Sequence, residues 1–253
     1  MKINKNSNLK TLSVVMPVYN EAPTVEGMIG EILAELKPLY EVQLIVVESG
    51  STDGTHEIVS MLEKEGIIEA IYQPTPLGKG NAVREGFKSV TNSVTIIFDG
   101  DREYSAKDVP ALVQPIFEGK SDFVLGSRFK VGEPMRSFGK NKIRSTILNL
   151  VHKFFSSMCN KLYRVSLRDP FTMYKVFKTD CVQNISFKEN GFAFDVELVA
   201  KLIRSGHKPI EIPVSYKSRG FSEGKKIRFF RDGYALPIAL VRHRYSQLNI
   251  IEN

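Results

Sequence analysis

The chain has 253 residues, and its 35 basic against 28 acidic side chains give a formal charge of +7. This length allows one large α/β domain or two small ones, and we interpret it as one. An excess of positive charge indicates an anionic partner, for which nucleic acid, an anionic membrane surface and phosphorylated substrates all qualify. Composition alone does not choose among these three classes.

Segments typical of spanning helices and of disulfide-stabilised proteins are missing from the sequence. No apolar run approaches the roughly 18 residues of a membrane-spanning helix, and Met1 to Lys10 lacks the apolar core of a signal peptide. Cys159 and Cys181 have no metal-ligand spacing and are expected to fill the core. We therefore expect a soluble or peripheral protein in a reducing cytoplasm.

The first half of the chain alternates between two kinds of apolar pattern. Continuous apolar runs predict buried strands, and apolar residues at helical spacing predict the helices between them. The expected strands cover residues 12–18, 42–47, 67–72 and 93–98, and the expected helices cover 25–36, 58–62 and 81–88. Uninterrupted alternation of this kind predicts a parallel, right-handed, doubly wound sheet.

The second half continues with less regular elements. We expect a helix over 109–117, a strand over 122–128, a mobile loop over 129–140, a helix over 141–162, a strand over 171–177, a helix over 192–203 and an edge strand over 210–216. The 141–162 helix carries Ile147, Leu150 and Phe154 at helical spacing beside Lys153 and Lys161. Packing against the sheet with a solvated basic face is the commoner explanation of such a helix, and the alternative is that it lies on a membrane surface.

Acidic side chains follow the strand over 93–98 at alternate positions, Asp99, Asp101 and Glu103. Ligands of open α/β sheets collect outside the carboxyl ends of the strands. Hard oxygen ligands suit Mg²⁺ or Mn²⁺, with a substrate phosphate completing the shell. A second turn, residues 48–55, suits anion or nucleotide binding, although its Ser, Thr and Asp residues are equally explained as helix N-caps. For the turn with Asp99, Asp101 and Glu103, the alternative is an ordinary turn whose acidic side chains are solvated.

Eight short motifs follow one another in a fixed order. They are MPVYNE (16–21), ESGSTDGT (48–55), GKGNAVREGF (78–87), DGD (99–101), GSR (126–128), DPFT (169–172), FDVEL (194–198) and EIPV (211–214). From about Leu12 to Ile227 the chain thereby resembles glycosyltransferase family 2, in its dolichol- or polyprenyl-phosphate mannose synthase branch. The resemblance implies the GT-A fold, an α/β, Rossmann-like, mostly parallel sheet sandwiched by helices, with a basic C-terminal helical segment.

The resemblance also implies a division of the chain. We expect a disordered N-terminus over 1–10, a single glycosyltransferase domain over 11–245 and a tail over 246–253. Within the domain, residues 11–127 form the nucleotide-sugar half and residues 128–245 the acceptor half.

By the same resemblance, residues take three kinds of role. The nucleotide-sugar would be bound by Pro17, Tyr19, Glu21, Glu48, Ser49, Lys79, Asp99, Arg219 and Lys225. Asp99, Asp101 and Glu103 would hold Mg²⁺ or Mn²⁺, and Arg128, Lys142, Arg144 and Ser145 would bind an acceptor phosphate. Asp99, Asp101, Arg128 and Arg219 would be catalytic.

Three positions and one short segment depart from the pattern of the resembled family. Ser49 stands where a second Asp is usual, Glu103 where Gln is common and Met173 where Gly is usual, while residues 222–225 only approximate the Gly-Glu-Ser-Lys pattern. The Ser49 difference concerns contacts to the base or ribose, so the donor nucleotide stays open. Glu103 in place of Gln is expected to strengthen a metal site.

The expected function is an inverting, metal-dependent transfer of a hexose from a GDP-mannose or UDP-glucose type donor to a polyprenyl phosphate. It would act peripherally at the cytoplasmic face of the membrane. The alternatives are transfer to a saccharide hydroxyl in cell-surface glycan synthesis and a nucleotide-sugar-binding protein without turnover. A hydroxyl acceptor needs a base, for which Asp195 and Glu197 are candidates unless they pair structurally with basic residues. Nucleic acid is disfavoured because no zinc or RNP-like pattern occurs.

Overall fold

The computed structural model describes residues 10–129, 142–217 and 235–248, without the side chains of 142–145 and 235. Residues 1–9 of the expected disordered N-terminus, nearly all of the expected mobile loop over 129–140, and residues 218–234 and 249–253 lie outside the described residues. Lys10, the last residue of the expected disordered segment, instead begins the first strand. No helix in the described ranges has both the length and the apolar character to cross a membrane.

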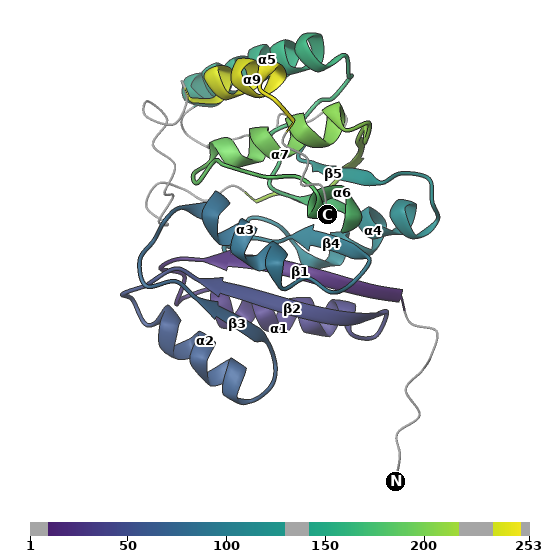
Figure 1. Cartoon of the computed structure of the whole chain (residues 1–253). Coiled ribbons are helices and arrows are strands. Elements are labelled where there is room, and N and C mark those ends of the chain that lie inside the picture. Colours follow the sequence, from purple (N-terminus) through teal and green to yellow (C-terminus); the bar gives the residue numbers. More distant parts are fainter. Residues whose placement is uncertain (1–9, 130–141, 218–234, 249–253) are drawn as a thin grey trace.

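One seven-stranded sheet forms the centre of the molecule, in the order β3-β2-β1-β4-β6-β5-β7 (Figure 1). The strands are β1 (Lys10–Val18), β2 (Tyr40–Glu48), β3 (Glu69–Tyr72), β4 (Val94–Ile97), β5 (Phe123–Ser127), β6 (Lys175–Lys178) and β7 (Ile210–Pro213). Only β6 runs antiparallel to its neighbours β4 and β5. The prediction of a mostly parallel α/β sheet is confirmed, and β7 is an edge strand as its proline indicates.

Helices cover both faces of this sheet. They are α1 (Val25–Leu36), α2 (Thr55–Lys64), α3 (Lys79–Lys88), α4 (Val109–Phe117), α5 (Lys142–Tyr163), α6 (Asp180–Gln183), α7 (Ala193–Arg204) and α9 (Ala235–Tyr245), with the short 3₁₀ turn η1 (Ala106–Asp108). Alternation along β1 explains the layers: Val14 and Met16 join the core under α1 and α4, whereas Val15 joins the core under α3. The central strands are therefore buried on both faces.

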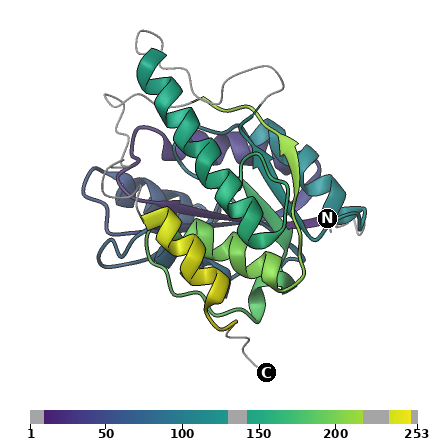
Figure 2. The same cartoon turned by 90° about the horizontal axis from the view of Figure 1, so that it is seen from above.

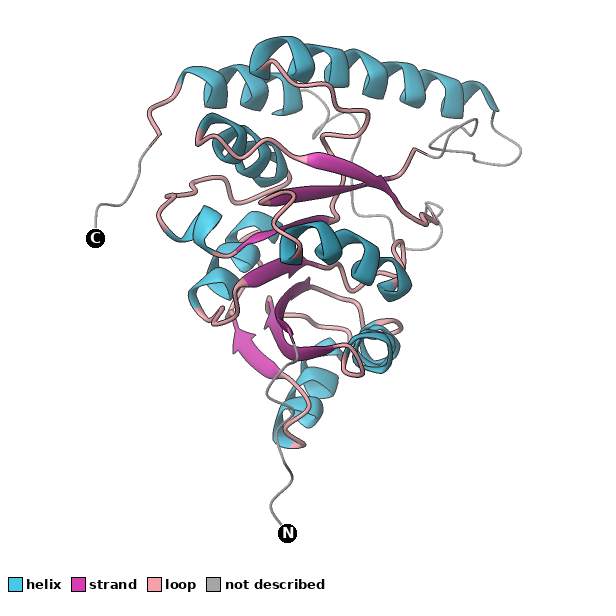
Figure 3. Ribbon diagram, turned by 90° about the vertical axis from the view of Figure 1, so that its right-hand side faces the viewer, coloured by secondary structure: helices cyan, strands magenta, loops and turns pink. Residues whose placement is uncertain are grey.

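The helices α5 and α9 form an additional layer outside α7 (Figures 1 and 3). Viewed from above, they lie beside each other over the body of the protein (Figure 2). Tyr163 of α5 donates to the Leu240 carbonyl of α9 at 2.7 Å, and Arg244 of α9 donates to the Leu162 carbonyl at 2.8 Å. The predicted helix over 141–162 is confirmed, but its main partners are other helices and not the sheet.

Candidate active site

The turns after β1 and β2 meet at the carboxyl edge of the sheet. The Asn20 amide donates to Ser51 Oγ at 2.9 Å, and the Thr52 amide donates back to Asn20 Oδ1 at 2.9 Å. Asn20 has a φ of 51°, a left-handed conformation that asparagine tolerates better than most residues. The two motifs MPVYNE and ESGSTDGT thus form one bonded unit, with Pro17 on β1 and Tyr19 and Glu21 in the turn after it.

The predicted nucleotide contacts Glu48 and Ser49 are both buried. Glu48 accepts from the Ser51 amide at 2.6 Å and lies 3.1 Å from His56 Nδ1, while Ser49 donates to Gln73 Oε1 at 2.9 Å. Burial acts to raise the pKa of Glu48, but the hydrogen bonds from Ser51 and His56 outweigh it, so this pKa lies below its usual value. Glu48 is therefore an anion that shapes the turn, and its contact with a donor stays a prediction.

A buried ion pair joins the third motif to the fourth. Lys79 Nζ lies 2.6 Å from Asp99 Oδ1 and 2.8 Å from Oδ2, so the ammonium spans both carboxylate oxygens. The two side chains are only 15% and 16% exposed. Lys79 is the first residue of α3, and Asp99 directly follows β4 and Phe98. The sheet order and the start of α3 therefore bring these two predicted site residues together.

Glycines on either side of Lys79 make this approach possible. Gly78 has a φ of +101°, and a Cβ there would lie 2.5 Å from the Asn190 carbonyl oxygen. A Cβ on Gly80 would lie 2.4 Å from Cβ of Phe194, at the start of α7. Only glycine lets the beginning of α3 press so closely against the segment that leads into α7. The GKG motif therefore lets Lys79 reach Asp99, because neither of its glycines has a side chain that would clash with Asn190 or Phe194.

The charges around Asp99 bear on whether a divalent ion fits there. Burial, together with the nearby carboxylates of Asp101 and Asp195, raises the pKa of Asp99 even though Lys79 acts in the opposite direction. Carboxylates that repel one another in a buried place are stabilised by a divalent cation, which prefers such oxygen ligands. Asp99 and Asp101 accordingly fit Mg²⁺ or Mn²⁺ on the chemistry of their oxygens.

Glu103 is not gathered with the two aspartates. Its carboxylate accepts from the Tyr216 hydroxyl at 3.0 Å, and its amide donates to Asp101 Oδ1 at 3.1 Å. Over the described ranges, no three His, Cys, Asp or Glu side chains lie close enough to hold one metal ion. Glu103 thus orders the acidic turn in this structure, and its role as a third metal ligand stays a prediction.

Replacing Lys79 is expected to expose Asp99 to metal ions. In Lys79→Gln the ammonium no longer competes for the Asp99 oxygens, so the protein without nucleotide should bind Mn²⁺ with a Kd about tenfold lower, a change of about 1.4 kcal/mol. Electron paramagnetic resonance of free Mn²⁺ measures this Kd. Lys88→Gln, at the exposed end of the same helix, is the matched control. An unchanged Kd in Lys79→Gln would show that the ammonium of Lys79 does not compete with Mn²⁺ for the Asp99 oxygens.

Sequence reasoning missed a second buried lysine beside this pair. Lys175 of β6 has a fully buried side chain and donates to Asp195 Oδ1 at 2.6 Å, and also to the Thr172 carbonyl. Burial lowers the pKa of Lys175 below its usual value. The available signal was a charged residue inside the apolar run over 171–177, a position that a lysine occupies only when it is paired.

Glu197 follows Asp195 by two residues on α7 and pairs with a different lysine, Lys201. Its carboxylate is fully buried and accepts from Lys201 Nζ at 2.7 Å and from the amides of Lys188 and Glu189 at 3.0 and 2.8 Å. Both candidate bases are therefore committed to buried lysines. The reading of Asp195 and Glu197 as structural partners of basic residues is the one that these contacts favour.

Arg128 occupies a buried bidentate ion pair. Its Nε and Nη2 atoms donate to the two oxygens of Asp169, each at 2.8 Å, and its guanidinium lies over the Tyr216 ring, 5.3 Å from the centroid. The carboxylate of Glu211 in turn accepts from the amides of Arg168 and Asp169. The GSR, DPFT and EIPV motifs thus hold one another. Direct contact of Arg128 with a phosphate stays a prediction.

The Asp169 pair gives a pH dependence of stability. Burial acts to raise the pKa of Asp169, but Arg128 outweighs it and lowers this pKa to about 2, from 3.8. A lowered pKa stabilises the fold above the unfolded value and loses that effect as the pH falls through the folded value. We expect about 2 kcal/mol of stability at neutral pH that fades between about pH 4 and pH 2. Urea unfolding at a series of pH values gives the free energy of unfolding against pH. In Asp169→Asn this free energy should no longer fall between about pH 4 and pH 2 by the amount that Asp169 contributes. The same pH dependence in the variant and the parent would refute the prediction.

Several predicted site residues cannot be placed. Arg219 and Lys225 lie outside the described residues. Lys142, Arg144 and Ser145 fall at the start of α5, where the backbone is described and the side chains are not. Their roles in binding donor and acceptor stay predictions.

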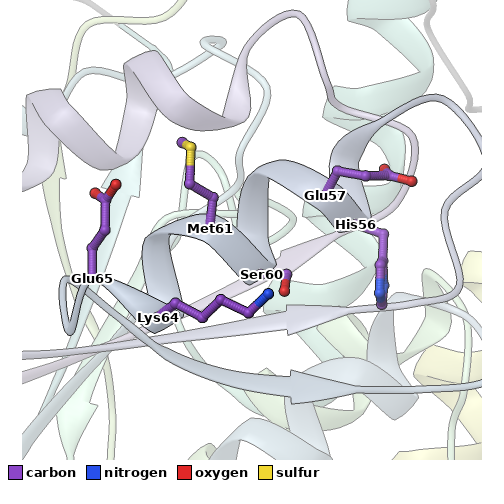
Figure 4. A pocket seen from close by; sticks show the side chains of 6 residues that line it. All are labelled: His56, Glu57, Ser60, Met61, Lys64 and Glu65. Atoms are coloured by element: carbon purple, nitrogen blue, oxygen red, sulfur yellow. The ribbon is translucent and has the colours of Figure 1, made fainter.

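A hollow of about 420 Å³ lies along α2, away from the acidic turn. Figure 4 shows its lining side chains, which α2 and the residue directly after it carry: His56, Glu57, Ser60, Met61, Lys64 and Glu65. The hollow is linked to the predicted nucleotide turn through the contact of His56 with Glu48.

Comparison with known proteins decides the family. The family model of glycosyl transferase family 2 matches residues 13–185, which include most of β1, all of β2 to β6 and six of the eight motifs. The chain belongs to glycosyl transferase family 2. The predicted enzyme class, a glycosyltransferase that uses a nucleotide-sugar donor, is confirmed at this level.

Three curated relatives of this family 2 enzyme span the chain. Glycosyltransferase AglJ of Haloferax volcanii is 25% identical over 90% of the chain and 70% of its own length. Glycosyltransferase AglD of the same organism is 26% identical over 86% of the chain, and dolichol-phosphate mannosyltransferase of Pyrococcus furiosus is 26% identical over 85%. The chain spans 35% of AglD and 58% of the mannosyltransferase, so both are longer proteins.

Solved structures confirm the GT-A type of fold. Glucosyl-3-phosphoglycerate synthase of Mycobacterium tuberculosis matches with a TM-score of 0.67 at 20% identity, over 96% of this chain and 83% of that protein. The same synthase in complex with Mg²⁺ and uridine diphosphate matches with a TM-score of 0.65, over 96% and 81%. This likeness shows the fold that the two proteins share. Mg²⁺ and uridine diphosphate are ligands of the synthase.

Proposed function

We propose that this enzyme is an inverting hexosyltransferase that moves a sugar from a nucleotide-sugar of the GDP-mannose or UDP-glucose type to a polyprenyl phosphate, peripherally at the cytoplasmic face of a membrane. Asp99 and Asp101 would hold Mg²⁺ or Mn²⁺. When bound, such an ion neutralises the charge of the departing diphosphate as a Lewis acid.

On the donor side the chain's own residues have separable tasks. Two hydrogen-bonded turns would line the nucleotide site. Asn20 and the buried Glu48 each bond to Ser51 and hold these turns in place. Lys79 holds the Asp99 carboxylate in a fixed position at the start of α3. A lysine at a helix N-terminus is also suited to a phosphate, since its charge adds to the positive end of the helix dipole there. We expect Lys79 to exchange Asp99 for the donor phosphate.

The observation that carries the acceptor assignment is the commitment of Asp195 and Glu197 to Lys175 and Lys201. A carboxylate whose oxygens already accept hydrogen bonds from a buried ammonium is poorly placed to accept the proton of a hydroxyl acceptor. A saccharide hydroxyl needs its proton removed, whereas a lipid phosphate is already ionised at neutral pH. The paired carboxylates therefore favour the phosphate acceptor. The likeness to a dolichol-phosphate mannosyltransferase supports the same choice.

Conservative changes at the two carboxylates test this proposal. Asp195→Asn keeps a hydrogen-bond acceptor for Lys175, so we expect it to lower kcat for polyprenyl phosphate less than about tenfold, whereas loss of a general base typically costs about 10²–10⁴-fold. Glu197→Gln should lower the melting temperature and change kcat little, because the buried carboxylate accepts from Lys201 Nζ and from the amides of Lys188 and Glu189. Radiolabel transfer to a short polyprenyl phosphate measures kcat. A folded Asp195→Asn protein without turnover would favour the hydroxyl-acceptor alternative.

A further inference from the structure

Half of the exposed large hydrophobic side chains among the described residues, six of twelve, lie on α5 and α9. They are Ile147, Leu150 and Phe154 on α5, and Ile238, Val241 and Tyr245 on α9, with exposures from 47% at Val241 to 76% at Tyr245. Each trio has the spacing i, i+3, i+7, which forms one stripe along a helix. We call these six residues the outer apolar face.

The helices α5 and α9 bury a second set of apolar residues in addition to the outer apolar face. The opposite sides of the same helices are already packed, since Leu148 and Cys159 of α5 and Leu240 of α9 are buried. Ile147, Leu150 and Phe154 were among the residues whose spacing suggested packing on the sheet, and the structure turns them outward. A helix with apolar residues on both sides needs two partners. The body of the protein supplies one of them.

Charge identifies the second partner. The sequences of α5 and α9 contain no Asp or Glu, and the exposed Lys153 and Lys161 flank the stripe on α5. Basic side chains beside exposed apolar ones at a helix surface are typical of contact with an anionic lipid interface. The formal charge of +7 for the whole chain has the same sign.

Contacts of α5 relate this face to the site. His152 of α5 lies 3.4 Å from Asp169 Oδ1, the partner of Arg128, and stacks near Phe129 just beyond β5. His152 is two residues from both Leu150 and Phe154, so its side chain leaves α5 on nearly the opposite side and is buried while theirs are exposed. The helix α5 therefore has the outer apolar face on one side and the Asp169 end of the site on the other.

We propose that the outer apolar face inserts into the interface of an anionic lipid bilayer, with α5 lying between the bilayer and the Arg128–Asp169 pair. This inference rests on the proposed function only in the choice of acceptor. The six side chains enter the headgroup and upper acyl region, and Lys153 and Lys161 contact lipid phosphates. The helices lie in the plane of the surface and do not cross it.

Vesicle sedimentation of the full chain tests the proposal. We expect binding to phosphatidylcholine vesicles containing about 30% phosphatidylglycerol, weaker binding to phosphatidylcholine alone, and loss of binding as salt is raised. Leu150→Glu/Phe154→Glu should raise the lipid concentration for half-maximal binding at least tenfold. Leu39→Glu, which changes another exposed leucine, between α1 and β2, should not. Failure of the parent to bind, or equal binding by the double variant, would overturn the proposal.

Two further measurements separate the possible outcomes. A parent that is dimeric in light scattering, and monomeric once Leu150 and Phe154 are replaced, would assign the face to a second copy and overturn the lipid assignment. In transfer assays the double variant should keep its rate on a short, water-soluble prenyl phosphate and lose at least tenfold on the same acceptor in vesicles. If the parent binds vesicles but glycosylates no prenyl phosphate, the proposed acceptor is wrong and the membrane face stands.

Discussion

Asp101→Asn should lower kcat at least about a hundredfold and leave the fold intact. The side chain lies in the turn after β4, where we propose that it binds a divalent ion, and such a cation contributes several kcal/mol to the departure of a charged leaving group. Asparagine still offers an oxygen to the Glu103 amide, which donates to Asp101 at 3.1 Å, so the turn should keep its shape. Steady-state kinetics with saturating Mg²⁺ or Mn²⁺ measure the loss, and circular dichroism checks the fold.

Asp122→Asn is the matched control for Asp101→Asn. Asp122 precedes β5 at the opposite edge of the sheet and pairs with the surface residue Lys178. Exposed pairs of this kind contribute about 0–1 kcal/mol, so this variant should have nearly normal kcat and stability. Full turnover by a folded Asp101→Asn enzyme would refute the assignment of Asp101 to the metal.

Arg128→Met should cost about 3–5 kcal/mol of unfolding free energy, because it leaves the Asp169 carboxylate buried without its cation. The double variant Arg128→Met/Asp169→Asn removes both charges and should therefore be more stable than the sum of the two single changes indicates, by about 2 kcal/mol. Urea unfolding of the four proteins gives this coupling energy. Additive losses would mean that the ion pair in the structure does not stabilise the fold.

The same double variant separates the structural role of Arg128 from a role at the acceptor. If Arg128 also binds the acceptor phosphate, kcat/KM for polyprenyl phosphate should fall about tenfold to a hundredfold, since hydrogen bonds to charged groups contribute about 1.5–3 kcal/mol. The KM of the donor should stay unchanged. A folded double variant with normal acceptor kinetics would leave Arg128 as a structural residue only.

Much of the fold could be predicted because its signals are local. The runs over 12–18 and 42–47 and the helical spacing over 25–36 recur in the structure as β1, β2 and α1. The direction of β6 could not be read from its residues, since an apolar strand pairs in either direction and the connecting chain decides. The periodicity over 141–162 gave the helix but not its orientation, because that helix carries apolar residues on two sides.

The candidate site was predictable by type and less so by contact. The motifs named Lys79 and Asp99 separately, but their ion pair depends on Gly78 and Gly80 meeting residues near the start of α7, far away in sequence. Lys175 was overlooked because its partner Asp195 follows 20 residues later on a different element. Long-range pairing of buried charges is set by the packing of whole elements, which a single sequence pattern does not contain.

The most direct measurement is sugar transfer by the purified chain from radiolabelled GDP-mannose and UDP-glucose, with Mg²⁺ or Mn²⁺, to a short polyprenyl phosphate and to a neutral saccharide. We expect label in the lipid phosphate with one of the two donors, dependent on the divalent ion and abolished by EDTA, and none in the saccharide. Transfer to the saccharide alone would contradict the lipid-phosphate acceptor, and binding of donor without transfer to either would contradict an active transferase.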